Sequence, residues 1–330
     1  PGDVVLVHGA RANYRIEERG RDFERPVVIR AADGSAGLEG LSLAGSSGIT
    51  IEGFDRVQAR LVTIRGGQRI TLRDNTIEGQ VQVGQRSSSV VLESNRIRAE
   101  DTRAILLDGR AEGGELRERV SRVVIRGNDI SAAEDGIQAV GADDITVEGN
   151  VFHDLRGGQH PDGIQVLAGS RWRIGGNEIR GFEWQGIILK PDKASHPDAA
   201  VDDIRIENNL IHQGQLAGLN IVGGATRVVV VNNTVRDVGL APNGGAALHY
   251  DRSVGLVAFN NLLSSVFDAG GQGASQHLSH NRVGGDLPDD GQLVDGGLSQ
   301  YVGQFAPRID RRGAVRPNRP DIGAVEVAAA

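Results

Sequence analysis

The sequence lacks several residue types and patterns, and each absence narrows the class of protein. None of the 330 residues is cysteine, which excludes disulfide bonds, thiol nucleophiles and cysteine-ligated metals. Aromatic residues make up only 4% of the chain, too few for a core built around large rings. No run of about 18 apolar residues occurs, so we expect no membrane span. Methionine is absent, and we expect Pro1 to be a processed start that lies after any signal peptide.

Long amphipathic helices and a strong charge bias are also missing. No long stretch places apolar residues at helical spacing. The formal net charge is −7, and acidic and basic residues are interspersed, which argues against nucleic acid as the main partner. Glycine is abundant at 47 residues, a composition that favours many short strands joined by tight turns.

The strongest positive signal is an internal repeat. Segments such as VVIRGNDI (123–130), ITVEGNVF (145–152) and IRIENNLI (204–211) share an alternating apolar strand, a polar or glycine pair, an asparagine and a further apolar pair. We expect each asparagine to take the left-handed backbone conformation at a bend and to hydrogen-bond to the next copy. The aligned residues are Asn75, Asn95, Asn128, Asn150, Asn177, Asn209, Asn233 and Asn261, and Asn281 extends the series.

A second alternating segment follows each copy, as in GIQAV (136–140), GIQVL (163–167) and GLNIV (218–222). Alternation is typical of half-buried strands, so every coil has at least two strands and a short third one. We therefore predict an all-β, single-stranded, right-handed parallel β-helix with caps at both ends. The residues expected to point into its core are Ile137, Ala139, Ile164, Val166, Ile187, Leu189, Leu219, Ile221 and Tyr250.

The repeat also divides the chain. Residues 1–45 read as an N-terminal cap with the first strands, residues 46–284 as the coils, and residues 285–330 as a C-terminal capping tail. Caps are expected because each coil buries its apolar side only by stacking on a neighbour.

Three features resemble the bacterial right-handed β-helix proteins of the pectate-lyase-like superfamily. They are the opening PGDVVLVHG (1–9) with RPVVIRAADG (25–34), the stacked NN-type coils, and the closing PDIGAVE (320–326), and together they cover nearly the whole chain. The resemblance implies a protein that is secreted, periplasmic or on the cell surface and that acts on polysaccharides. Individual activities are not indicated. The GHG and RIK pair of polygalacturonases, the DPHD of alginate epimerases and the RxPxxR of pectate lyases are all missing.

Outward side chains of the second strand predict where a ligand would bind. Stacked strands repeat about every 4.8 Å, a spacing that suits an extended sugar chain. Insertions at 156–165, 191–203 and 239–251 are expected to border the same face, and inserted loops on one face of a repeat array usually build the binding surface. The polar residues expected on this face are Gln138, Gln165, Asn220, His249, Lys190 and Asp251.

The string HPDGIQ (160–165) is the most suggestive short motif. Its Asp162 repeats as Asp135 one coil earlier, and stacked carboxylates could share a Ca²⁺ ion, bind sugar hydroxyls or simply cap a turn. His160 is expected to contact substrate. Trp184 could be an aromatic platform for a sugar ring or a structural plug.

These residues favour β-elimination on a uronic-acid polysaccharide. Lys190 or His249 would be the base, and Asp162, Asp251 or a bound Ca²⁺ would assist. A glycoside hydrolase using Asp135, Asp162 and Asp251, a C5-epimerase, and a non-catalytic carbohydrate-binding or structural β-helix remain alternatives. The polymer and the oligomeric state are not indicated by the sequence.

Overall fold

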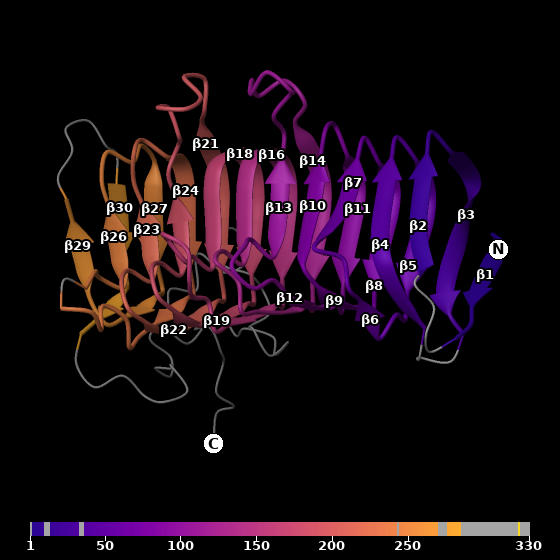
Figure 1. Ribbon diagram of the computed structural model, residues 1–330. Coiled ribbons are helices and arrows are strands. Elements are labelled where there is room, and N and C mark those ends of the chain that lie inside the picture. Colours follow the sequence, from indigo (N-terminus) through magenta and orange to yellow (C-terminus); the bar gives the residue numbers. More distant parts are fainter. Residues whose placement is uncertain are drawn as a thin grey trace, which may run out of the picture.

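The computed structural model describes residues 2–9, 14–32, 36–242, 244–269, 276–284 and Gly323. This part of the chain contains strands and turns but no helix, and every strand pair in it is parallel. The strands stack into an elongated solenoid in which each turn of chain adds one strand to each of three sheets (Figure 1). The fold is a right-handed parallel β-helix, as predicted.

Sheet one contains the strand that precedes each repeat asparagine. Its members are β1 (Val4–Val7), β3 (Asp22–Ala31), β5 (Ser47–Glu52), β8 (Gln68–Arg73), β11 (Ser88–Glu93), β14 (Val120–Arg126), the second halves of β16 (Ile137–Glu148) and β18 (Ile164–Gly175), β21 (Val201–Glu207), β24 (Thr226–Val231), β27 (Leu256–Phe259) and β30 (Gln276–Ser279).

Sheet two contains the second predicted strand of each coil. Its members are β2 (Tyr14–Arg19), β4 (Gly37–Ala44), β7 (Leu61–Arg65), β10 (Gln80–Gly84), β13 (Ile105–Asp108), the first halves of β16 and β18, β20 (Ile187–Leu189), β23 (Leu219–Ile221), β26 (Leu248–Tyr250) and β29 (Val266–Asp268).

Sheet three is the short third strand that directly follows the asparagine. Its members are β6 (Arg56–Val57), β9 (Thr76–Glu78), β12 (Arg96–Arg98), β15 (Asp129–Ser131), β17 (Val151–His153), β19 (Glu178–Phe182), β22 (Leu210–Gly214), β25 (Thr234–Val235), β28 (Leu262–Leu263) and β31 (Arg282–Val283).

The core fills the space that the three sheets enclose. All the residues predicted to point inward are buried, including Tyr250. Trp172 is buried in sheet one, and its Nε1 donates a hydrogen bond to the carbonyl of Ala142 at 2.9 Å. Because the inward positions alternate with outward ones, the strand register decides which polar side chains reach the surface.

The asparagine ladder forms as predicted, at the corner between sheets one and three. Nδ2 of Asn150 donates to Oδ1 of Asn177 at 3.0 Å and also to the carbonyl of Ile125. The same side-chain bond links consecutive members from Asn75 to Asn281. Each link also uses the backbone, since the N–H of Asn150 donates to the same oxygen of Asn177.

The predicted backbone conformation of these asparagines was wrong by one position. The left-handed residue is the one before each ladder asparagine, for example Asp74, Ser94, Gly127 and Asn208. The preceding residue makes the bend, and the asparagine itself is then free to point its amide along the stack.

The outer face of sheet one carries a ladder of alternating charges. Arg30, Glu52, Arg73, Glu93, Arg126 and Glu148 occupy one register position in successive strands. Gly175 comes next, and the cation there is supplied by Arg173, which pairs with Glu148 at 3.1 Å and with Glu207 at 2.6 Å.

The predicted ends of the solenoid are only partly described. Strands β1 to β4 already pair within sheets one and two, so the described residues between 4 and 44 continue the stack. The predicted capping tail, residues 285–330, lies outside the described residues except for Gly323, whose N–H donates to the carbonyl of Asn260 at 3.0 Å.

Candidate functional site

The outward strip of sheet two follows the predicted register. Gln138 pairs with Gln165, Gln165 with Ile188, Ile188 with Asn220, and Asn220 with His249. Lys190 and Asp251 directly follow β20 and β26, so they lie at the same edge of the sheet. All six predicted polar residues therefore belong to one face of the solenoid, which we call the sheet-two face.

One predicted outward position shifts because of a β-bulge. Ala139 is paired with Val166, but Val140 is paired with Ala168, so Leu167 has no partner in β16. Leu167 therefore interrupts the second outward column, where it was expected opposite Val140. Gly141 in β16 has no partner in β18 either, so the register recovers at Ala142 and Gly169.

Insertions border the sheet-two face along both edges. The 156–165 and 239–251 insertions lie where sheet three leads into sheet two, and the 191–203 insertion lies where sheet two leads into sheet one. A further insertion, residues 109–119, follows β13 at that second edge. It projects from the solenoid beside the loop that precedes β21 (Figure 1). The two loops line a common cleft of about 430 Å³ that contains Arg117, Arg119 and His196.

Asp135 and Asp162 lie beneath the sheet-two face, at the corner where sheet three leads into sheet two. Both are buried, and Asp162 has 0% exposure. Oδ1 of Asp135 accepts the backbone N–H of Asp162 at 3.1 Å, and Oδ1 of Asp162 accepts that of Gln185 at 2.9 Å. The acids therefore stack one coil apart and tie three coils together.

The second oxygen of each acid holds an amide on the face. Nε2 of Gln138 donates to Oδ2 of Asp135 at 3.1 Å, and Nε2 of Gln165 donates to Oδ2 of Asp162 at 2.9 Å. The two amides are also joined, because Nε2 of Gln138 donates to Oε1 of Gln165 at 2.6 Å. Two buried carboxyl groups thus fix two adjacent surface amides.

Burial raises the pKa of both acids. The pKa of Asp135 rises to about 7, mainly because burial penalises its charged form; the hydrogen bond from Asp162 and the charge of Arg103 only partly oppose this. The pKa of Asp162 is raised well above its usual range by burial and by the neighbouring charge of Asp135. Near neutral pH the pair therefore favours binding protons, even though Nε of Arg103 lies 3.9 Å from Oδ2 of Asp135.

This arrangement does not fit the predicted calcium site. Calcium in proteins takes several ionised or carbonyl oxygens, whereas these acids are buried, raised in pKa and already hydrogen-bonded. No group of three or more His, Asp or Glu side chains suited to a metal occurs among the residues that the structure describes.

Asn220 and His249 continue the face beyond the acid pair. Asn220 is buried. Its Nδ2 donates to Oε1 of Gln185 at 2.9 Å, and its buried Oδ1 has no hydrogen-bond partner among the described residues. Nε2 of His249 is also buried and has no partner in the same part of the chain, so a base at His249 would act through Nδ1. The ring of His249 lies 5.2 Å from the exposed ring of Phe267 on the next strand.

Lys190 and Asp251 have different surroundings although they share an edge. Lys190 is exposed and makes no ion pair within the described part of the chain. Oδ1 of Asp251 accepts the N–H of Gly223 at 2.7 Å, and its Oδ2 pairs with Arg252 at 3.2 Å. Lys190 is therefore free to meet a ligand, whereas Asp251 is already engaged.

His160 and Trp184 meet at the opposite edge of the face. Their rings pack edge to face with centroids 4.9 Å apart. The backbone N–H of Trp184 donates to the carbonyl of Pro161 at 3.1 Å. His160 is exposed and Trp184 is half-buried, so the pair presents an aromatic rim beside the strip.

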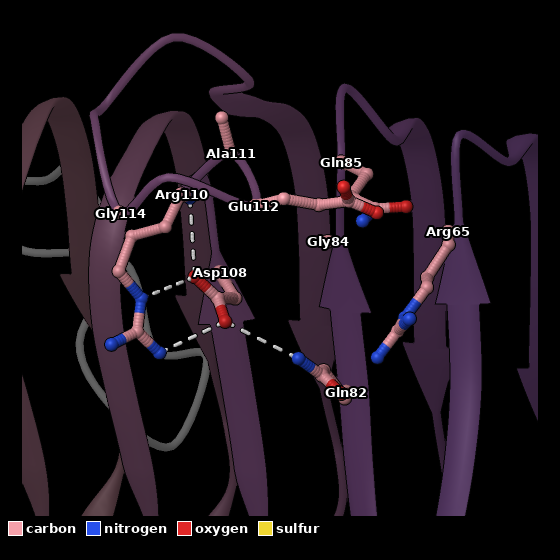
Figure 2. Close-up of a pocket in the computed structure, with 9 residues that line it drawn as sticks. All are labelled: Arg65, Gln82, Gly84, Gln85, Asp108, Arg110, Ala111, Glu112 and Gly114. Carbon is pink, nitrogen blue, oxygen red and sulfur yellow. Dashed lines mark hydrogen bonds and ion pairs between the residues drawn. The ribbon is translucent and has the colours of Figure 1, made fainter.

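The sequence analysis missed a second polar cluster on the sheet-two face. A cleft of about 360 Å³ lies below the 109–119 loop, and Figure 2 shows Arg65 on one side of it and the Asp108–Arg110 pair on the other. Arg110 donates to both oxygens of Asp108, from Nε at 2.7 Å and from Nη2 at 2.9 Å. The insertion itself could have indicated this cluster in the sequence. It follows the strand segment AILLD (104–108) and begins with Gly109 and Arg110.

Comparison with known proteins agrees with this architecture. Residues 109–263 match the family described as the right handed beta helix region. No curated protein matches the chain. The described residues contain no helix long and apolar enough to cross a membrane.

Solved structures show the same fold at low sequence identity. The chain aligns with the Dettilon tailspike protein at a TM-score of 0.54 and 13% identity, covering 88% of this chain and 65% of that one. It aligns with the surface protein and adhesin PfbA of Streptococcus pneumoniae at a TM-score of 0.54 and 11% identity, covering 85% of this chain and 84% of that one. It aligns with XylC, solved in complex with xylose, at a TM-score of 0.50 and 13% identity, covering 92% of this chain and 67% of that one. The protein is thus a right-handed parallel β-helix protein.

Proposed function

We propose that the sheet-two face binds an acidic polysaccharide and that the chain is a secreted polysaccharide lyase. One observation carries the proposal. One face of sheet two, with insertions along both edges, carries the fixed amides of Gln138 and Gln165 and the exposed Lys190, which makes no ion pair with a described residue. Strands about 4.8 Å apart place successive polar groups along an extended sugar chain, as polymer recognition requires.

The free cation favours an acidic polymer. A uronate carboxylate beside Lys190 would be held by charge, and the enolate that forms after proton removal would be stabilised by the same group. In this elimination a base takes the proton alpha to the carboxylate, a carbon–carbon double bond forms, and the glycosidic carbon–oxygen bond breaks as its oxygen gains a proton. Lys190 and His249 are the candidates for base and stabiliser.

Hydrolysis is supported less well. It needs two carboxyl groups on either side of the scissile bond. Asp135 and Asp162 lie together beneath the face, and Asp251 is engaged by Gly223 and Arg252. These contacts give Asp135 and Asp162 a positioning role for the two glutamines.

A non-catalytic carbohydrate-binding surface is the second candidate. It is favoured by the buried Nε2 of His249 and by the amides of Gln138 and Gln165, which are already locked within the protein. Among the proteins of similar fold, PfbA is described as a surface adhesin and XylC was solved with xylose. The first name is consistent with a role at a cell surface, and the second with sugar binding.

A panel of polyuronates separates these functions. We expect absorbance at about 235 nm to rise when the protein meets its polymer, because elimination creates a conjugated double bond. Lys190→Ala and His249→Ala should each reduce the rate by about 10²–10⁴-fold, the usual contribution of a proton-transfer group. Arg25→Ala removes an exposed cation from β3 in sheet one, away from the sheet-two face, and should leave the rate unchanged.

Three outcomes would contradict the proposal. Full turnover by the Lys190→Ala, His249→Ala double variant would remove the site. New reducing ends without the absorbance rise would indicate hydrolysis. Binding without turnover across the whole panel, with and without EDTA, would favour the non-catalytic surface.

A further inference from the structure

The cleft below the 109–119 loop, which we call the Arg65 cleft, contains two cations in opposite states. Arg110 is held by the bidentate pairing with Asp108 and by the contact of its own backbone N–H with Oδ1 of Asp108 at 3.1 Å. Burial alone would raise the pKa of Asp108, but the hydrogen bonds and charge of Arg110 outweigh it and lower that pKa, so this pair is ionised and mutually neutral. Arg65, in contrast, is exposed and has no ion pair with any described residue.

The rest of the cleft is lined with groups suited to hydroxyls. Gln82 lies in its floor, with Nε2 donating to Oδ2 of Asp108 at 3.2 Å, and Glu112 extends from the loop above (Figure 2). Gly84 also lines the cleft, and a Cβ at this position would lie 3.0 Å from the carbonyl oxygen of Asp108 on the neighbouring strand. One free guanidinium with neighbouring amide and carboxylate groups matches a ligand that carries one carboxylate and several hydroxyls.

We propose that the Arg65 cleft is a subsite for one uronic-acid unit of the bound polymer. The carboxylate of that unit pairs with the guanidinium of Arg65, and its hydroxyls meet Gln82 and Glu112. The inference rests on the proposed function, since it assumes that the polymer follows the sheet-two face.

The position of the cleft implies a long binding site. Arg65 and Lys190 are separated by the strand steps β7, β10, β13, β16, β18 and β20, which amounts to about 24 Å. A chain of several sugars would therefore contact both cations at once, while a mono- or disaccharide would contact only one. Long polymers should gain affinity from Arg65, and very short ones bound at Lys190 should not.

Binding measurements test the subsite without requiring turnover. The probes are polygalacturonate, alginate and hyaluronate, with dextran as the neutral control, and the readout is affinity electrophoresis in the His249→Ala background, which keeps Lys190. Arg65→Ala should weaken binding of the preferred acidic polymer about tenfold and leave dextran unchanged. The matched control is Arg25→Ala, which removes another exposed arginine, one without an ion pair to any described residue, from β3 in sheet one and should change affinity less than twofold.

The outcomes separate this inference from the proposed function. Equal affinities for Arg65→Ala and Arg25→Ala would overturn the subsite even if the native protein cleaves the polymer. A loss confined to Arg65→Ala would support the subsite even if no elimination occurs. Arg65→Lys should restore part of the affinity, because lysine keeps the charge but loses the bidentate geometry.

Discussion

Two buried polar ladders run along this solenoid, at different corners of its coils. At the corner between sheets one and three, asparagine amides link every coil from Asn75 to Asn281. At the corner between sheets three and two, Asp135 and Asp162 are followed by Gln185 and then by Ala217, and the ladder ends. Both ladders use a side-chain oxygen to accept a backbone N–H from a neighbouring coil, but in opposite directions along the stack.

The difference lies in what each side chain can donate. An asparagine amide both donates and accepts, so copies can follow one another without limit. An ionised carboxylate only accepts, so stacked acids repel each other, and their burial raises the pKa of each. The asparagine ladder is a device for stacking coils, whereas the acid pair is local and holds Gln138 and Gln165 on the sheet-two face.

Breaking the asparagine ladder should have the largest effect. Asn150→Ala would leave the N–H and Nδ2 of Asn128 without their shared acceptor and would remove the bond to the carbonyl of Ile125. We expect a loss of about 3–5 kcal/mol in the free energy of unfolding, because several buried hydrogen bonds disappear together. Urea titration measures this loss in the free energy of unfolding.

The matched control is Gln215→Ala, which truncates an exposed amide outside the ladder and should cost less than about 0.5 kcal/mol. If Asn150→Ala were no more costly than Gln215→Ala, the ladder would contribute nothing to stability.

The acid pair should make stability depend on pH. The pKa of Asp135 is about 7 in the folded chain and lower when unfolded, so its protonated form stabilises the fold and that stabilisation is lost as the pH rises through 7. Asp162 acts in the same direction. Between pH 4.5 and 8 we expect the free energy of unfolding to fall by roughly 2–4 kcal/mol from this pair. Urea titrations at several pH values measure the slope.

Asp135→Asn mimics the protonated acid and should flatten this slope. An unchanged slope in the variant would mean that Asp135 does not bind a proton in the folded state. Thermal unfolding at pH 4.5 shows whether the variant folds normally. At that pH the native protein and Asp135→Asn both carry a neutral group at position 135, so they should melt at similar temperatures.

The smallest effect should come from the charged ladder on the outer face of sheet one. Arg126 pairs with Glu93 at 2.8 Å, and more than half of the arginine side chain is exposed at 53%. Solvent and salt screen such a pair, so Arg126→Gln should reduce the free energy of unfolding by less than about 1 kcal/mol. Urea titrations at low and high salt test this. A loss above about 2 kcal/mol would show that exposed and buried ladders are not as different as we infer.

The repeat made much of this architecture accessible from the sequence. Because side chains alternate along each strand, the buried set around Ile137 and Ile164 was predicted correctly, and so was the register that stacks Gln138 to His249, although Asn220 in that column is buried. The Asn75–Asn281 ladder was predicted because the same residue recurs in the same place in each repeat. Periodic features translate directly into stacked ones in a solenoid.

Features outside the repeat were harder to predict. The bulge at Leu167 has no sequence signal, because the same number of residues separates the flanking pairs in β16 and in β18, and it displaced the second outward column. Asp162 looked like a surface acid before a glycine, but the turn carries it beneath the strip and buries it. Arg65 and Arg110 were not predicted as site residues, because the insertion that brings a loop over them interrupts the repeat.

The coil, its three strands, the direction of each strand side chain and the face that carries the polar strip could be derived from the residue pattern, because they follow from local alternation and from register repeated along one axis. The burial of Asp135 and Asp162, the rise in their pKa, the availability of Lys190 and Arg65 to a ligand, and the course of the inserted loops beside the strip are set only in the folded chain. Those properties depend on distances between coils and on the packing of irregular segments, and no repeat pattern encodes them.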